Sequence, residues 1–175
     1  GDMTLFESVA HSFTKMSTGG FGTDAGSLGA FSAYSQWVVI AFITMAGVSV
    51  ALHWRGLQDP REYGRNSEFR IYVMIIGVAS VFFLIGTLGG AVATTIRDSV
   101  FTAVSLVTPT GYASAVFGQW AVALQSGAVG LMFLGGMAGS TAGSVKTFRL
   151  GILTSAARND LRRIMHPRGV FVARL

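Results

Sequence analysis

The sequence predicts an all-α membrane protein built from tandem helix–pore-helix–helix repeats, in which a short half-membrane helix and a loop stand between two spanning helices. Long uncharged apolar runs and a motif that occurs twice predict this fold. Only 12% of the 175 residues are charged, about half of the roughly 25% that is usual in soluble domains. The 26 residues between Arg70 and Arg97 and the 47 residues between Asp98 and Lys146 contain no Asp, Glu, Lys or Arg. Uncharged apolar runs longer than about 18 residues indicate membrane spans.

The repeated motif begins with a helix-capping signature, which is Thr-x-x-Glu at residues 4–7 and Thr-x-x-Asp at residues 95–98. In such a capping box the hydroxyl and the carboxylate bind N–H groups that the first helical turn leaves free. The two helices are predicted at 4–16 and 96–107. Each would be roughly 18–20 Å long, which is too short for a hydrocarbon core of about 30 Å. We therefore expect two pore helices that enter the membrane and stop partway across it.

Each pore helix leads into a loop of small and hydroxyl-bearing residues that ends in an aromatic residue. Non-helical backbone is tolerated at membrane depth only where protein covers it or where it lines a watery cavity. Carbonyl oxygens that face such a cavity can replace the hydration shell of a cation, and the pore helices would direct the negative ends of their dipoles at it. The filter loops are predicted at 17–23 and 108–113. Their candidate ion-binding residues are Ser17, Thr18, Gly19, Gly20 and Phe21, and Thr108, Pro109, Thr110, Gly111 and Tyr112.

The remaining apolar segments predict complete spans at 34–52, 69–93 and 119–149, the last continuing as a cytoplasmic helix to residue 165. A third-type repeat that lacks its first helix would occupy 1–52 and a fourth-type repeat 69–165, with a cytoplasmic loop at 53–68 and a cytoplasmic tail at 166–175.

The uncharged run 99–145 could hold two full spans instead of one pore helix and one span. The second arrangement places both Arg-rich segments on the same side of the membrane, as the positive-inside rule favours. Pro109 and Gly111 also break a helix where the first copy of the motif turns. We therefore expect a re-entrant segment at this point of the chain.

Two further groups of residues each have two interpretations. Ala46, Gly47, Val48 and Ser49 place small residues within the span 34–52, where they would form either an unwound loop that narrows a pore or a close contact with another helix. Lys146 and Arg149 lie three positions apart, on one face of a predicted helix. They would either anchor the last span at the interface or face an inner vestibule and raise the barrier to a cation.

The sequence disfavours several other classes of protein. The net charge of +5 is concentrated beside apolar spans, so it indicates membrane anchoring and not a nucleic-acid surface. No Ser/His/Asp arrangement or metal-ligand spacing is present, so we expect no enzyme, no metal cofactor and a packing role for His11. An intramembrane enzyme or a non-conducting membrane scaffold remains the alternative. A glycine-rich turn in a soluble protein would explain one copy of the motif but not two.

Three strings resemble the Trk/Ktr/HKT superfamily of potassium transporters, namely FTKMSTGGFGT at 13–23, TPTGYA at 108–113 and GSTAGSVKTFR at 139–149. The resemblance covers essentially the whole chain, as the last two of four repeats. It implies a pseudo-fourfold, K+-channel-like pore architecture in which backbone carbonyls bind K+, with Gly20 and Gly111 as filter glycines. It also implies a gating loop at 46–49 and a pore-facing cation at Lys146 or Arg149. Pro109 departs from the family pattern, because a Thr or another small residue is expected there.

The resemblance further implies potassium uptake by a multi-pass protein of the bacterial inner membrane, with K+ as the transported ion and no cofactor. The implied partners are the missing N-terminal half of the same chain, a second copy in a homodimer, the lipid bilayer, and a cytoplasmic nucleotide-binding regulatory subunit of the TrkA/KtrA type. No nucleic acid is expected to bind.

Overall fold

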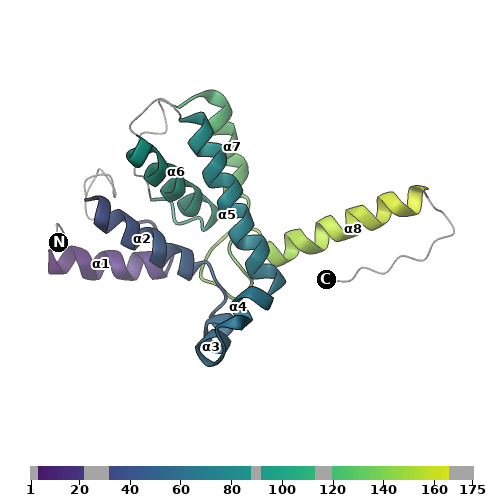
Figure 1. Ribbon diagram of the computed structural model, residues 1–175, viewed down its shortest axis with the longest axis horizontal. Helices are drawn as coiled ribbons and strands as arrows, with labels where there is room; N and C mark the ends of the chain where they lie inside the picture. The colour runs from purple at the N-terminus through teal and green to yellow at the C-terminus, as the bar shows by residue number, and fades with distance from the viewer. Residues whose placement is uncertain (1–3, 22–31, 88–91, 113–119, 166–175) are drawn as a thin grey trace.

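A computed structural model describes residues 4–21, 32–87, 92–112 and 120–165, and these residues form eight α-helices and no strand. The prediction of an all-α protein is therefore confirmed. The helices, drawn in Figure 1, are α1 (Leu5–Met16), α2 (Ala33–Ala46), α3 (Val50–Gln58), α4 (Arg61–Arg65), α5 (Ser67–Gly86), α6 (Val92–Val107), α7 (Val122–Met132) and α8 (Thr147–Met165).

Helices α1 and α6 are the two short helices that the repeated motif predicts. Thr4 caps α1 with the expected capping box, since its N–H donates to the Glu7 carboxylate (2.7 Å) and its hydroxyl accepts from the Glu7 N–H (3.3 Å). Helix α6 differs from the prediction, because it begins at Val92 and so encloses Thr95 and Asp98. These two residues therefore do not cap its start. At 12 and 16 residues, the helices span roughly 18 and 24 Å, less than a bilayer core.

The predicted span 34–52 is broken at residues 47–49, where one of its two interpretations places an unwound loop. Helix α2 ends at Ala46, and the chain bends by 99° before α3 begins at Val50. The break is stable because another segment satisfies its backbone: the Met137 N–H donates to the Gly47 carbonyl oxygen at 2.9 Å. Among the described residues, α5 is the one helix that is both long and apolar enough to cross a bilayer by itself.

The predicted helix 119–149 is wrong. Helix α7 ends at Met132, and the glycine-rich segment 133–146 has no helix. Glycine costs roughly 1 kcal/mol relative to alanine at each helix-interior position, and the segment instead bonds to itself. The Gly135 N–H donates to the Val145 carbonyl oxygen (2.8 Å), and the Thr147 N–H donates to the Gly136 carbonyl oxygen (3.1 Å). The segment is therefore a loop between two helices.

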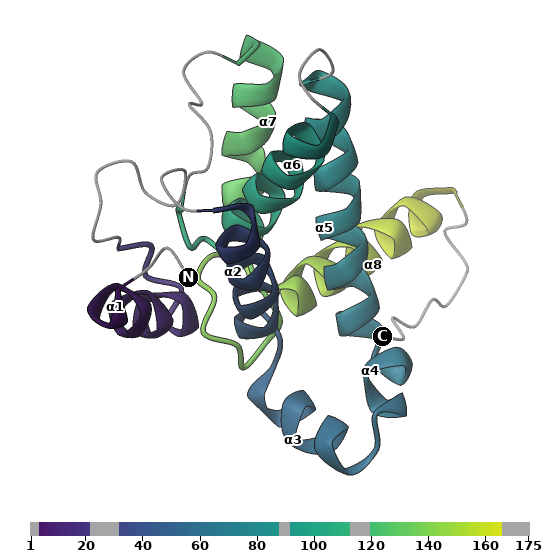
Figure 2. The ribbon, with the colours of Figure 1, turned by 60° about the vertical axis from the view of Figure 1, so that its left-hand side comes forward.

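Helix α6 is central to the packing, although it is too short to span a membrane. One of its faces buries Phe101 and Val104 against α2. Its other face contributes Ala103 and Val107 to a second buried cluster, which also contains Tyr72 and Phe83 of α5. Figures 1 and 2 both show α6 lying between α2 and α5, with α7 beside α5. This arrangement fixes where the C-terminal end of α6 points.

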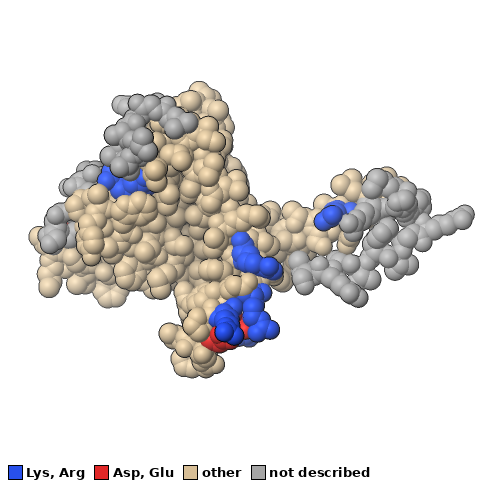
Figure 3. All heavy atoms as spheres, viewed as in Figure 1, with Lys and Arg blue, Asp and Glu red and all other residues tan. Residues whose placement is uncertain are grey.

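Large apolar side chains are exposed on the outer faces of the molecule, and the charged side chains are clustered in a few places. Large side chains of α5 are exposed, among them Met74, Val78 and Ile85, each at least 60% accessible. Figure 3 shows the described Lys and Arg side chains mainly around α4, the first turns of α5, and α8. A surface of this kind suits a helix bundle within a membrane, with basic residues outside its apolar zone.

Replacing Gly47 by Ala should destabilise the fold, since an added Cβ would lie 2.8 Å from Tyr72 Cζ and 3.0 Å from Thr108 Cγ2. Overpacking of this kind costs about 1–3 kcal/mol. The matched control is Gly77→Ala, whose Cβ would have no neighbour within 4 Å. Thermal unfolding of the full-length protein in detergent should show a lower midpoint for Gly47→Ala alone. Equal midpoints would contradict the close packing described at Gly47.

Candidate ion-binding site

The loops that follow α1 and α6 meet backbone to backbone. Gly20 and Gly111 both have positive φ angles, +71° and +77°, a conformation that glycine adopts without steric cost. A Cβ added to Gly20 would overlap the carbonyl oxygen of Thr110 and would lie 3.6 Å from the Gly111 carbonyl carbon. The two glycines predicted as equivalent by the repeat are thus adjacent in space. Both are reached from the C-terminal ends of short helices.

The second loop is tied to the last turn of α6. The Thr110 N–H donates to the Ser105 carbonyl oxygen at 2.9 Å, and the Ser105 hydroxyl donates to the Tyr112 carbonyl oxygen at 2.7 Å. The hydroxyls of Thr108 and Thr110 bond to each other at 2.7 Å. Pro109 lies between these two threonines, both of which are buried. Its missing N–H leaves the neighbouring bonds to α6 intact.

The first loop is tied both to α1 and to a segment far along the chain. The Gly19 N–H donates to the Thr14 carbonyl oxygen at 2.9 Å. The Thr18 hydroxyl lies 2.7 Å from the carbonyl oxygen of Ser17 and 3.1 Å from that of Thr141. The loop 133–146 therefore lies directly against the first filter loop. Residues 22, 23 and 113 of the predicted filter loops are outside the described residues.

The predicted gating loop 46–49 and the loop 133–146 form one hydrogen-bonded layer. Besides the bond from Met137 to Gly47, the Val50 N–H donates to the Gly139 carbonyl oxygen (3.2 Å) and the Thr141 hydroxyl donates to the Ala46 carbonyl oxygen (3.1 Å). The sequence did not predict these partners. The signal for them was the string of glycines at 135, 136, 139 and 143, because glycine disfavours a continuous helix.

Lys146 and Arg149 do not share a helix face, contrary to the sequence analysis. Lys146 precedes α8, and its ammonium donates to the carbonyl oxygens of Ser140 (3.2 Å) and Ala142. These two carbonyls flank Thr141, which accepts from Thr18 of the first filter loop. Arg149, in contrast, is exposed in the first turn of α8. Of the two basic residues, Lys146 is the one whose charge lies close to the filter loops.

Glu68 is a further residue that sequence reasoning missed. Its carboxylate accepts from the Ala138 N–H (2.6 Å) and from the Phe148 N–H (3.2 Å). It thus connects the first turn of α5 to the loop 133–146 and to the N-terminal turn of α8, where the helix dipole favours an anion. A single carboxylate holds three segments together.

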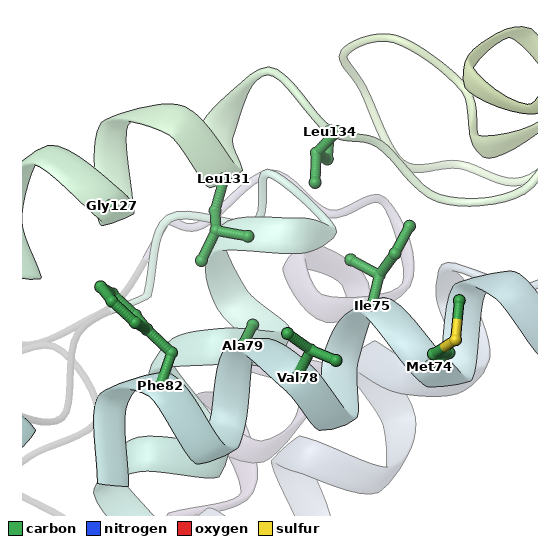
Figure 4. Close-up of a pocket in the computed structure, with 8 residues that line it drawn as sticks. All are labelled: Met74, Ile75, Val78, Ala79, Phe82, Gly127, Leu131 and Leu134. Carbon is green, nitrogen blue, oxygen red and sulfur yellow. The ribbon is translucent and has the colours of Figure 1, made fainter. Parts of the chain in front are cut away.

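An apolar groove of about 380 Å³ lies between α5 and α7, apart from these loops. Figure 4 shows Phe82 of α5 directed toward Gly127 of α7, with Ala79 and Leu131 further along the groove. A Cβ added to Gly127 would lie 2.5 Å from the Phe82 ring. All residues that line the groove are apolar or glycine, so it offers no ligand for a cation. The filter loops remain the candidate ion site.

Comparison with known proteins agrees with this geometry. Residues 85–175 match the model of a protein family described as TrkH, a cation transport protein. The chain is 29% identical to the Trk system potassium uptake protein TrkH of Vibrio parahaemolyticus over 99% of this chain and 38% of that protein. It is 31% identical to the TrkH protein of Escherichia coli K12 over 99% of this chain and 37% of that protein. The chain therefore spans little more than a third of the length of these relatives.

A solved structure is similar over nearly the whole chain. The crystal structure of the potassium transporter TrkH from Vibrio parahaemolyticus superposes with a TM-score of 0.94 at 27% identity, covering 99% of this chain and 39% of that one. The helix–pore-helix–helix architecture is thus consistent with the fold of that structure.

Replacing Glu68 by Ala should loosen the loop 133–146 and the first turn of α8, because the Ala138 and Phe148 N–H groups lose their acceptor. Hydrogen exchange of the full-length protein should be faster at these two amides, by about tenfold, as expected for loss of a charge-assisted bond worth about 1.5 kcal/mol or more. The control is Glu62→Ala, which removes a partly buried carboxylate 3.8 Å from Arg65. Unchanged exchange at both amides in the Glu68 variant would contradict the assigned contacts.

Proposed function

The chain belongs to the TrkH family of cation transport proteins, and on this premise we propose that it forms two walls of a membrane pore that takes up K+. Because the chain spans 38% of the first relative's length, the activity of the whole protein is part of the proposal. The relatives are named as potassium uptake proteins of the Trk system, and a Trk-type membrane subunit needs a pathway for a dehydrated cation. The adjacent loops at Gly20 and Gly111 supply a candidate for that pathway.

The contact between the two filter loops is the observation that carries this proposal. Two half-length helices end at the same place, so the negative ends of both dipoles converge there. Non-helical backbone with carbonyl oxygens follows each helix, and such oxygens can replace the hydration shell of K+. The candidate ion ligands are carbonyls of Ser17–Phe21 and of Thr108–Tyr112. Two further walls would come from the part of the relatives' length that this chain does not cover.

The layer beneath the filter is the proposed gate. Residues 46–49 and 133–146 hold each other through backbone hydrogen bonds, and Thr141 connects this layer to Thr18. Lys146 places a positive charge in the same layer. A fixed ammonium near the pathway raises the electrostatic energy of a passing cation, most strongly where water is scarce. Lys146 is therefore assigned to the barrier, and exposed Arg149 to the inner surface.

The proposed setting is the bacterial inner membrane, which the chain crosses more than once, with K+ as cargo and no cofactor. The proposed partners are the N-terminal half of the same chain, a second copy, and a cytoplasmic nucleotide-binding regulatory subunit. Helix α8 projects from the first turns of α5 (Figure 1) and exposes Leu153, Leu161 and Ile164. Such an exposed apolar row beside basic residues is suited to a contact with another protein.

An enzymatic alternative finds less support. The relatives are named as transport proteins. His11 contacts the Tyr112 hydroxyl at 3.3 Å, and His53 contacts the Tyr63 hydroxyl at 2.9 Å. Both imidazoles thus face phenols rather than a serine that they would activate.

Replacing Gly20 or Gly111 by Ser should weaken discrimination of K+ from Na+. At Gly20 the side chain must displace the Thr110 carbonyl, and at Gly111 it must tolerate a positive φ angle, which costs about 1–2 kcal/mol. The Gly20 variant should therefore be the more severe. The test is growth of a K+-uptake-deficient host at low K+ with the full-length protein, with and without added Na+. Gly130→Ala, with no neighbour within 4 Å, is the control. Unchanged uptake and selectivity in both serine variants would count against the filter.

Replacing Lys146 by Ala should increase the rate of cation uptake several-fold, since the barrier charge is removed. Rubidium tracer influx into cells that produce the full-length protein measures this rate, normalised to protein in the membrane. Lys146→Arg keeps the charge and serves as the control. A rate that stays constant or falls in the Ala variant would assign Lys146 to structure alone.

A further inference from the structure

The aromatic residue that ends the second filter loop has a position unlike that of its counterpart in the first. Phe21 and Tyr112 are equivalent under the 91-residue offset of the repeat. The Phe21 side chain is 77% exposed, whereas the Tyr112 residue is 2% exposed. Only Tyr112 carries a hydroxyl, and this hydroxyl reaches across to the first repeat. The two repeats therefore do not contribute equally to the contact between them.

The hydrogen-bonding role of the Tyr112 hydroxyl follows from its neighbours. It lies 2.9 Å from the Phe21 carbonyl oxygen, and because a carbonyl cannot donate, the phenol proton must point to Phe21. The hydroxyl of Thr14 and Nδ1 of His11, both on α1, also lie within hydrogen-bond distance of the phenol oxygen. The hydroxyl thus bonds to the first loop and to the helix that leads into it.

The backbone of Tyr112 is fixed from the other side. Its carbonyl oxygen accepts from the Ser105 hydroxyl at 2.7 Å, so the residue is held to the last turn of α6. The line of contacts runs from α6 through Tyr112 to Phe21 and α1. It lies beside the contact of Gly20 with Thr110. Two separate contacts therefore set the distance between the filter loops, one between backbones and one through a side chain.

We propose that Tyr112 is a positioning residue for ion selectivity, and that its hydroxyl holds the Phe21 carbonyl and with it the spacing of the two filter loops. The proposal rests on the proposed function of these loops as a K+ filter. Within the described residues, the hydrogen bond from the Tyr112 hydroxyl ties the Phe21 carbonyl to the second loop. Selectivity between K+ and Na+ depends on the arrangement and field of the carbonyl dipoles. If the Phe21 carbonyl were released from this hydrogen bond, both the arrangement of the carbonyl dipoles and their electrostatic field would change.

The test compares Tyr112→Phe with wild type in the full-length protein. The substitution removes one oxygen atom and keeps the ring that is buried against α2 and α6. We expect uptake to persist and the ratio of the KM for Na+ to the KM for K+ to fall by about threefold to tenfold, the range for loss of one hydrogen bond. Tyr63→Phe, which removes a hydroxyl that bonds to His53 and not to a filter loop, should leave this ratio unchanged.

A second variant separates positioning from general stability. Thr14→Val removes a neighbour of the phenol oxygen but leaves the bond to Phe21, so it should lower the ratio less than Tyr112→Phe does. Thermal unfolding of each variant in detergent gives the matching stability. A lower midpoint with an unchanged KM ratio in Tyr112→Phe would overturn the proposal and assign the hydroxyl to folding alone. Absence of K+ uptake by the wild type itself would instead refute the function on which the proposal rests.

Discussion

The contact between the Gly20 loop and the carbonyl of Thr110 is the constraint on which the rest of the structure depends. The approach is so close that no side chain fits between the two backbones. It requires α1 and α6 to end at one point, and both helices are shorter than a bilayer core. Helix α6 is held in this position because α2 and α5 bury its two faces.

A second constraint is that broken helices in a membrane must satisfy their free backbone groups within the protein. The break after α2 and the loop after α7 solve this problem together. Gly47 and Ala46 supply carbonyls, while Met137 and Thr141 supply donors. Without the other loop, neither loop would have partners for these backbone groups. The layer beneath the filter is therefore a joint feature of both repeats, just as the filter contact is.

A continuous set of hydrogen bonds connects the exposed helix α8 to the first filter loop. Thr147, the first residue of α8, bonds through its hydroxyl to the Gly135 carbonyl oxygen at 2.9 Å. Glu68 holds both the start of α8 and the Ala138 amide. Thr141, three residues further on, reaches Thr18. A displacement of α8 would therefore be transmitted through these bonds to the loop 133–146 and to its contact with Thr18.

The amino-acid sequence by itself determined the membrane class, the two short helices and the glycine-bearing loops that follow them, because charge segregation and the runs of apolar, small and hydroxyl-bearing residues are local patterns along the chain. It misplaced the start of α6, since the capping pattern at Thr95 and Asp98 is a local preference that the packing of α6 overrode. It left open whether residues 46–49 unwind, and it predicted an unbroken helix across 133–146. Whether a glycine-rich segment stays helical depends on which partners receive its backbone groups, and only the tertiary structure brings Gly47 to Met137, Thr18 to Thr141 and Tyr112 to Phe21.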